Sequence, residues 1–231
     1  MQVEVREVPE VSEVPEEPEV AFLETERLVL RRFSEGDEEH LVALDADPGV
    51  MRFLTGGVPT PRHVIREETL PRMLRLDAEY GGRLGYWAAE EKAAGRRFVG
   101  WFELRPVDGD GRECELGYRL RQDAWGRGYA TEGARALVRA AFTELGVERV
   151  FAETMAVNRG SRRVMEKAGL GYVRTFHQEW PEYVEGAEHG DVRYELSRAE
   201  WEARRGSGRD GSRGQRTVHH PEHASGQTWD R

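Results

Sequence analysis

The stretch DAWGRGYATEG, residues 123 to 133, places two glycines around one arginine directly before an apolar helical pattern. Gly126 and Gly128 have no Cβ, so a ligand can approach their backbone amides closely. The pattern that follows, Thr131 to Leu145, repeats its apolar residues at helical spacing, and Gly146 ends it. A glycine loop at a helix N-terminus directs several backbone N–H groups towards one point. The sequence therefore predicts an anion site, above all for a phosphate.

The strand predicted just before the loop, ECELGYRLR at residues 113–121, alternates in polarity. Its apolar face carries Cys114, Leu116, Tyr118 and Leu120, and its polar face carries Glu113, Glu115, Gly117 and Arg119. A Rossmann fingerprint instead follows a buried apolar strand and needs a third glycine where Thr131 stands. A P-loop needs Lys followed by Ser or Thr after its second glycine, and neither is present. The pyrophosphate of coenzyme A is a third interpretation of the same loop, beside ATP and a dinucleotide.

The remaining segments predict strands and helices around this central unit. Seven strand patterns lie at about residues 27–33, 85–91, 97–107, 113–121, 149–157, 171–180 and 191–201. Helical patterns lie at about residues 34–46, 61–80, 131–145 and 161–168. Ser161 is expected to cap the last helix, and Pro71 is expected to break or kink the second. The turn residues between the second, third and fourth strands predict antiparallel hairpins.

The two ends of the chain differ in composition from the rest. Residues 1–20 hold seven glutamates against one arginine, and so carry six of the nine net negative charges. This Glu/Pro/Val segment predicts a disordered acidic leader. Residues 204–231 are rich in Gly, Ser, Arg and His without apolar periodicity, which predicts a disordered tail. The folded domain is therefore expected over residues 21–203.

Several functional classes are excluded by composition. No apolar run is long enough to span a membrane and the N-terminus lacks the features of a signal peptide, so we expect a soluble, cytoplasmic protein. Cys114 is the only cysteine, which excludes an internal disulfide and a cysteine metal cluster. The histidines of the tail have no carboxylate framework around them, so no metal site is expected. The acidic balance argues against nucleic acid as a partner.

Three segments occur in an order that resembles the GNAT acetyltransferase superfamily, and within it the branch of ribosomal-protein N-terminal (α-amino) acetyltransferases. They are ETERLVLR (24–31), ELGYRLRQDAWGRGYATEGARALV (115–138) and AVNRGSRRVMEKAGLGYV (156–173). The resemblance covers about residues 22–201. It implies an α/β (α+β) fold with a mixed, mostly antiparallel seven-stranded sheet, about four flanking helices, and strands four and five splayed apart. It also implies acetyl-CoA as co-substrate, with no metal.

The resemblance assigns the residues that would bind this co-substrate. The backbone of Gly126, Arg127, Gly128, Tyr129, Ala130 and Thr131 would hold the pyrophosphate. Leu120, at the end of its strand, would hydrogen-bond the pantetheine arm, and Asn158 would meet that arm from the opposite side. The family's loop often begins with Gln or Arg where this chain has Asp123. That difference removes a side-chain contact and leaves the amides in place.

Candidate catalytic groups lie on the neighbouring strands and on the helix after the fifth strand. Glu115 is the first candidate for a general base, with Glu103 and Glu153 as further ones; a solvated carboxylate or an arginine partner is the alternative role. Ser161 matches the serine of the α-amino branch and would donate a hydrogen bond to the leaving sulfur, since that helix has no tyrosine. Cys114 is expected to pack in the core rather than act as a nucleophile.

The expected activity is therefore acetyl transfer from acetyl-CoA directly to a primary amine. A protein N-terminus, an aminoglycoside, a polyamine and another small amine all remain open as acceptors. A non-catalytic acetyl-CoA-binding regulatory module and a nucleotide-binding protein are the alternative classes. Acceptor choice is assigned to residues 55–80 and 176–191, and the second segment offers glutamates for a cationic acceptor. Similar proteins are commonly dimers, so a homodimer is the oligomeric form to test.

Overall fold

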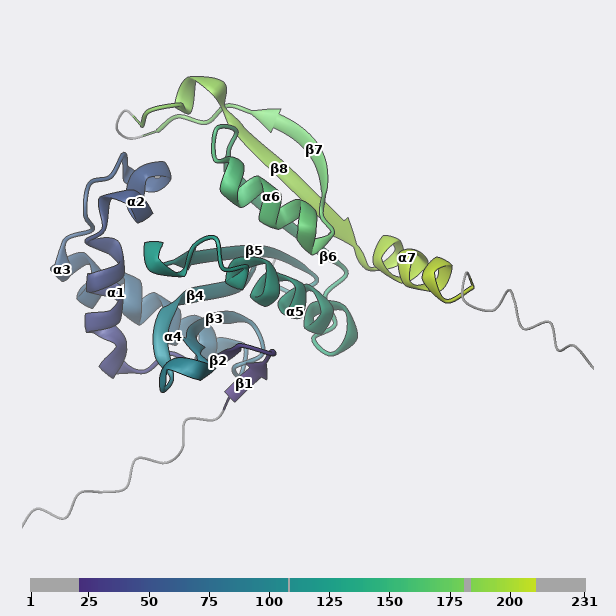
Figure 1. Cartoon of the computed structure of the whole chain (residues 1–231), viewed down its shortest axis with the longest axis horizontal. Coiled ribbons are helices and arrows are strands. Elements are labelled where there is room, and N and C mark those ends of the chain that lie inside the picture. The colour runs from purple at the N-terminus through teal and green to yellow at the C-terminus, as the bar shows by residue number, and fades with distance from the viewer. Residues whose placement is uncertain (1–20, 108, 181–183, 211–231) are drawn as a thin grey trace, which may run out of the picture.

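The computed structural model describes residues 21–107, 109–180 and 184–210, which form one eight-stranded sheet covered by helices on both faces (Figure 1). The strands are β1 (Ala21–Glu24), β2 (Leu28–Arg32), β3 (Gly85–Glu91), β4 (Arg97–Pro106), β5 (Glu113–Leu120), β6 (Arg149–Met155), β7 (Gly171–Phe176) and β8 (Asp191–Ser197). Their order in the sheet is β1-β2-β3-β4-β5-β6-β8-β7, and only β5 and β6 run parallel. The predicted class is confirmed. The additional strand is β1, which pairs with β2 ahead of the expected first strand.

Two hydrophobic clusters attach the helices to opposite faces of this sheet. One face carries α1 (Glu38–Asp45), α2 (Pro48–Thr55), α3 (Arg62–Val64) and α4 (Leu70–Glu79) around Leu41, Ile65 and Trp101. The other carries α5 (Tyr129–Thr143), α6 (Arg159–Ala168) and α7 (Arg198–Asp210) around Phe102, Leu137 and Tyr194. Short 3-10 turns occupy Glu35–Asp37, Lys92–Ala94, Gln122–Ala124 and Ala187–His189.

The helices before β3 differ from the expectation in two places. Helix α2 was not predicted, although Asp47 accepts a hydrogen bond from the Gly49 N–H, Pro48 opens the helix, and Gly56 ends it in the left-handed conformation. Pro71 does not break the next helical region. It lies in the first turn of α4, and the segment Ile65–Thr69 before it forms a π-helical turn.

The parallel pair β5 and β6 is short, and this opens the sheet. The two strands pair only from Glu113 to Glu115 on β5, so the remainder of β5 has no partner on that side. On its other side the Arg121 N–H donates to the Val99 carbonyl (2.9 Å). Because antiparallel pairs alternate in their hydrogen bonding, Leu120 and Tyr118 turn their backbone groups away from β4 and into the gap. The splay expected of the fourth and fifth strands is confirmed in β5 and β6.

The described residues extend past the expected end of the domain. Helix α7 continues beyond Ala203 to Asp210. Residues 1–20 and 211–231 lie outside the described residues, so the acidic leader and the end of the tail stay predictions. In the part of the chain that is described, none of the helices combines the length and apolar composition that a bilayer span requires.

Helix α5 lies very close to the sheet because residue 133 has no side chain. A Cβ at Gly133 would come within 2.3 Å of the buried Phe102 ring. We expect Gly133→Ala to lower the free energy of unfolding by about 1–3 kcal/mol through overpacking, as measured by urea denaturation. Gly206→Ala on α7 is the matched control, since no atom lies within 4 Å of its Cβ position. Equal loss of stability in the two variants would contradict the close packing.

Candidate active site

The glycine loop presents a row of unpartnered backbone amides at the start of α5. Gly126 and Gly128 both have left-handed backbone conformations, with φ of 70° and 84°, and Gly128 is the N-cap of the helix. Within the described ranges, the N–H groups from Gly126 to Thr131 have no hydrogen-bond acceptor. The first amide to be satisfied is that of Glu132, which donates to the Gly128 carbonyl (3.0 Å). This geometry is that of an anion site at a helix N-terminus.

The first of the three matching segments holds this loop in place. The Glu132 carboxylate accepts hydrogen bonds from the Thr25 hydroxyl (2.6 Å) and from the backbone and side chain of Arg27 (2.8 and 2.7 Å). Arg27 also donates to the Arg127 carbonyl (2.8 Å). The turn before β2 is thereby tied to both the loop and the first turn of α5. Because charge-assisted bonds of this kind are strong, the amides are fixed before any ligand arrives.

The side chains of the loop point away from the amide row. Arg127 pairs with Glu91, and the Tyr129 hydroxyl donates to the same carboxylate. These hydrogen bonds, first from Tyr129 and then from Arg127, lower the pKa of Glu91 to about 2. Asp123, where the family often has Gln or Arg, accepts from Arg97 (2.7 Å). Glu91 therefore holds the side chains of Arg127 and Tyr129, and the backbone amides of both residues stay free for a ligand.

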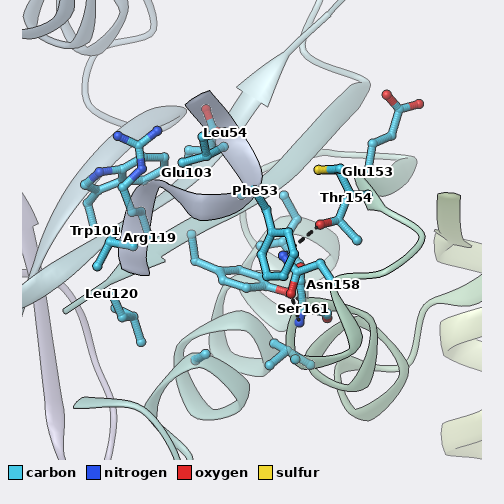
Figure 2. Close-up of a pocket in the computed structure, with 18 of the residues that line it drawn as sticks. Phe53, Leu54, Trp101, Glu103, Arg119, Leu120, Glu153, Thr154, Asn158 and Ser161 are labelled. Atoms are coloured by element: carbon cyan, nitrogen blue, oxygen red, sulfur yellow. Dashed lines mark hydrogen bonds between the residues drawn. The ribbon is translucent and has the colours of Figure 1, made fainter. Parts of the chain in front are cut away.

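A cavity of about 1400 Å³ runs from this loop through the gap between β5 and β6 (Figure 2). It continues to the sheet face beneath α1, α2 and α4, where Asp45, Glu103, Glu115 and Arg119 line it. It brings together nearly all the residues predicted from the sequence: Glu115, Leu120, Gly126, Gly128, Tyr129, Ala130, Thr131, Asn158 and Ser161. Arg127 is the one predicted residue that does not line it.

Asn158, rather than Ser161, caps helix α6. Its side-chain oxygen accepts from the Ser161 N–H (3.1 Å), and its side-chain nitrogen donates to the Thr154 hydroxyl (3.1 Å). The expectation that Ser161 is the cap is wrong, because helix α6 begins at Arg159 and places Ser161 in its first turn. The Leu120 N–H faces the gap between β5 and β6. The Leu120 carbonyl accepts a hydrogen bond from the Trp125 indole N–H (2.8 Å). The predicted contacts of Leu120 and Asn158 with a pantetheine arm stay predictions.

The Ser161 hydroxyl faces a phenol that sequence reasoning did not select. The Tyr118 hydroxyl lies 3.0 Å from Ser161 Oγ and also donates to the Ser161 carbonyl (3.0 Å). Burial raises the pKa of Tyr118, so it stays protonated. Tyr118 comes from β5 and Ser161 from α6, so the two hydroxyl groups meet across the gap. The signal in the sequence was a tyrosine on an otherwise apolar strand face.

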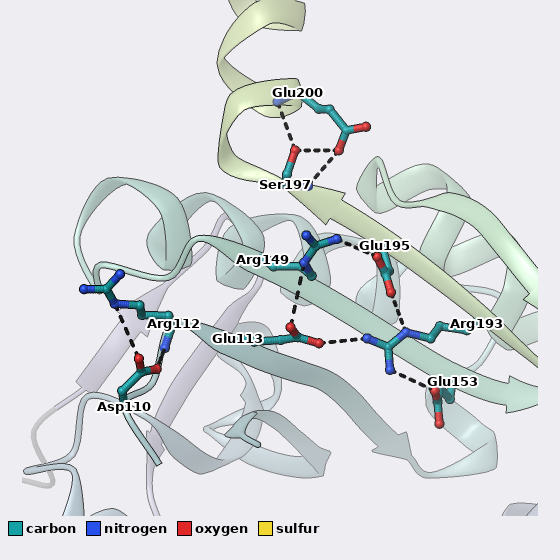
Figure 3. A network of polar contacts seen from close by, with 9 residues as sticks. All are labelled: Asp110, Arg112, Glu113, Arg149, Glu153, Arg193, Glu195, Ser197 and Glu200. Carbon is teal, nitrogen blue, oxygen red and sulfur yellow. Dashed lines mark hydrogen bonds and ion pairs between the residues drawn. The ribbon is translucent and has the colours of Figure 1, made fainter. Parts of the chain in front are cut away.

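The three candidate bases have different environments. Glu115 forms an ion pair with Arg105, and its side chain is 21% exposed. Burial raises the pKa of Glu115, against the effect of Arg105. Glu153 is bound by Arg193 (3.1 Å), which also holds Glu113 and Glu195 in the network of Figure 3. Both carboxylates therefore have a cationic partner.

Glu103 is the most deeply buried of the three. Burial, and then the negative charge of Glu115, raise the pKa of Glu103 to about 7. Its carboxylate occupies the space above Gly117, where a Cβ would lie 2.2 Å from Glu103 Oε1. Gly117 has no side chain and thereby leaves room for this group. Arg105, which pairs with Glu115, also lies 3.7 Å from Glu103 Oε2, so Glu103 has the more distant cationic partner.

The remaining expectations concern packing and the acceptor segment. Cys114 is completely buried in the core, which confirms its structural role. Glu185 binds Arg52 on α2 (3.3 Å) at the surface, whereas Glu182 lies outside the described residues. In the ranges that are described, no three His, Cys, Asp or Glu side chains are arranged to hold a metal ion.

Comparisons with known proteins identify the family. The family described as Acetyltransferase (GNAT) domain matches residues 27–171. The FsC-acetyl coenzyme A-N(2)-transacetylase of Aspergillus fumigatus is 37% identical over 188 residues, which cover 78% of this chain and 77% of that protein. The chain therefore belongs to the GNAT acetyltransferase family and is an acetyltransferase enzyme.

Solved structures of other acetyltransferases share its fold. The spermidine N-acetyltransferase of Vibrio cholerae, solved with CoA and spermine, aligns with a TM-score of 0.63 over 77% of this chain and 99% of its own, at 16% identity. An acetyltransferase of Salmonella typhimurium that modifies the N-terminal serine of ribosomal protein L7/L12 aligns with a TM-score of 0.61 over 75% and 96%, at 17% identity.

The raised pKa of Glu103 makes the stability of the fold depend on pH. The folded state binds this proton more tightly than the unfolded chain, so stability is lost as the pH rises from 4.5 to about 7. We expect Glu103→Gln to match the wild type at about pH 4 and to exceed it by about 3 kcal/mol at about pH 8. Urea denaturation at both values measures the difference. A difference that does not change with pH would show that Glu103 ionises normally.

Proposed function

We propose that this acetyltransferase moves an acetyl group from acetyl-CoA directly to a primary amine. One observation carries the proposal: a single cavity joins the unpartnered amides of the glycine loop, the open edge of β5 and a buried carboxylate. These are the three parts that the reaction needs. The first would hold the donor's phosphates, the second its extended arm, and the third the proton of the attacking amine.

The donor would lie along β5 as an additional strand does. Its pyrophosphate would accept hydrogen bonds from the amides of residues 126–131, at the positive end of the α5 dipole. The pantetheine arm would then follow the edge that β6 leaves open, where the backbone groups of Leu120 and Tyr118 face the gap. A backbone N–H of this edge would polarise the acetyl carbonyl. Asn158 would border the arm from the opposite side.

The acceptor amine must be neutral when it attacks. An α-amine with a pKa near ~7.8 is roughly one-tenth neutral at pH 7, whereas a lysine amine near ~10.4 is almost entirely charged. We assign proton removal to Glu103, directly or through a water, because a base is most effective when its pKa lies near the working pH. Glu115 supports Glu103 in two ways. It pairs with Arg105, and its negative charge raises the pKa of Glu103.

The leaving group needs less assistance. As the new C–N bond forms and the C–S bond breaks, the sulfur takes the electron pair and departs as a thiolate, whose acid has a pKa near ~8.5. The Ser161 hydroxyl would donate a hydrogen bond to that sulfur, and Tyr118, whose own proton goes to the Ser161 carbonyl, would hold Ser161 in position. The amine proton goes to Glu103, and the products are the acetamide and coenzyme A.

The acceptor class and the assembly are separate proposals. A protein N-terminal α-amine, an aminoglycoside and a polyamine are all compatible with transfer to an amine. A catalytically inactive protein of the same fold would bind acetyl-CoA and release no thiol with any of them. The expected homodimer would be tested by sedimentation of the full chain.

Loss of the left-handed glycine should abolish donor binding. A side chain at Gly128 would strain the backbone and press on the Arg27 guanidinium that holds the loop, so we expect Gly128→Val to weaken acetyl-CoA binding at least about a hundredfold. Isothermal calorimetry on the full chain measures the affinity. Gly95→Val is the control, since Gly95 has a similar φ of 65° in a hairpin turn and does not line the cavity. No acetyl-CoA binding by the wild type would refute the proposed function itself.

The choice between Glu103 and Glu115 can be made from pH profiles of thiol release. We expect Glu103→Gln to lower kcat by roughly a hundredfold or more and to remove the part of the profile that rises through about pH 7. Glu115→Gln should keep that rise and move its midpoint to lower pH, because one negative charge near Glu103 is removed. If the rise disappears in Glu115→Gln and persists in Glu103→Gln, Glu115 is the base.

A further inference from the structure

Buried polar atoms without hydrogen bonds are concentrated around the cavity. Within the described residues six buried side-chain nitrogen or oxygen atoms have no partner, and five belong to residues that line it. The five are Trp101 Nε1, Glu103 Oε2, Arg119 Nε, Trp180 Nε1 and Asp191 Oδ2. Native proteins leave few such atoms unsatisfied. Trp180 and Asp191 interact with each other, so the atoms of Trp101, Glu103 and Arg119 are the ones left for a ligand in the cavity.

Three of these atoms lie together on the sheet face that α1, α2 and α4 cover. Trp101 on β4 is directly opposite Arg119 on β5, and Glu103 is opposite Gly117 in the next row on the same face. Figure 2 shows Trp101, Arg119 and Glu103 on one side of the cavity, with Asn158 and Ser161 on the other. The first two offer N–H donors, and the third offers an acceptor oxygen.

The charge of Arg119 is already balanced. Its Nη1 forms an ion pair with the buried Asp45, whose second oxygen accepts from the Thr60 hydroxyl (2.9 Å). Its guanidinium lies over the Trp101 ring, 5.1 Å from the centroid. With its charge neutralised, the remaining Nε–H suits a neutral oxygen better than a carboxylate.

We propose that the Trp101 and Arg119 N–H groups form a subsite that binds a neutral carbonyl oxygen of the acceptor molecule. The acceptor amine lies one row away, at Glu103, about 7 Å along the strands. The inference rests on the proposed function and narrows its acceptor to a primary amine that carries a carbonyl group several bonds from the nitrogen. A polyamine has no oxygen to satisfy these two donors.

The test compares acceptors that differ only in this oxygen. Short ω-amino amides, from glycinamide upward, are assayed by thiol release beside the alkylamines of equal chain length. We expect the KM of the wild type to be roughly tenfold lower for the best amide than for its alkylamine, as one or two hydrogen bonds would give. Equal KM values for each matched pair would overturn the subsite.

Two tryptophan variants separate the subsite from a general effect on packing. Trp101→Phe removes the donor and keeps a ring beneath Arg119, so it should raise the KM for the amide roughly fivefold and leave that for the alkylamine unchanged. Trp87→Phe removes the sixth of these unpartnered atoms, an indole N–H in the core that does not line the cavity, and should change neither value. A KM increase for both acceptors in Trp101→Phe would overturn the proposal.

A direct binding measurement keeps the test independent of turnover. The ω-amino amide that best fits the spacing is titrated by calorimetry into the full chain saturated with coenzyme A. Binding that Trp101→Phe weakens supports the subsite even if no amine is acetylated, in which case only the proposed transfer fails. Absence of binding by the wild type overturns the subsite, whether or not other amines are acetylated.

Discussion

The separation of β5 from β6 after three residue pairs is the constraint on which the site depends. A sheet with continuous pairing would satisfy every backbone group of β5 and would have no opening between its two faces. Because the pairing stops at Glu115, the edge that carries Tyr118 and Leu120 stays open. The cavity can then pass from the glycine loop to the opposite face of the sheet. The site is thus built on an interruption of the sheet, which helices on both faces stabilise.

The two ends of this cavity are held by different kinds of interaction. At the glycine loop, Glu132 ties the turn before β2 to the start of α5 through Thr25 and Arg27, which leaves the amides fixed and free. On the opposite face, carboxylates and arginines are paired with one another, and Glu103, the most deeply buried of the candidate bases, has only a long contact (3.7 Å) with Arg105. A buried group of that kind resists ionisation, which gives Glu103 a pKa suited to proton transfer near neutral pH.

Much of the fold and of the donor side followed from local patterns. Alternation placed Cys114 and Glu115 on opposite faces of β5, and the glycine loop with its helix appeared where it was predicted. Helix α2 was missed because its eight residues are too short for periodicity to stand out, although its capping residues are present. Glu103 was ranked below Glu115 because nothing local distinguishes one strand glutamate from another.

The sequence by itself determined the order of the elements, the glycine loop and the family, because these depend on residue spacing along the chain. Tertiary structure alone decided the rest. It placed Tyr118 against Ser161 across the gap and made Asn158 the cap of α6. It also paired Arg105 with Glu115 and placed the Glu103 carboxylate above Gly117. Each of these joins residues that different elements contribute. The chemistry of a carboxylate or a hydroxyl depends on its burial and its neighbours, which exist only once the chain is folded.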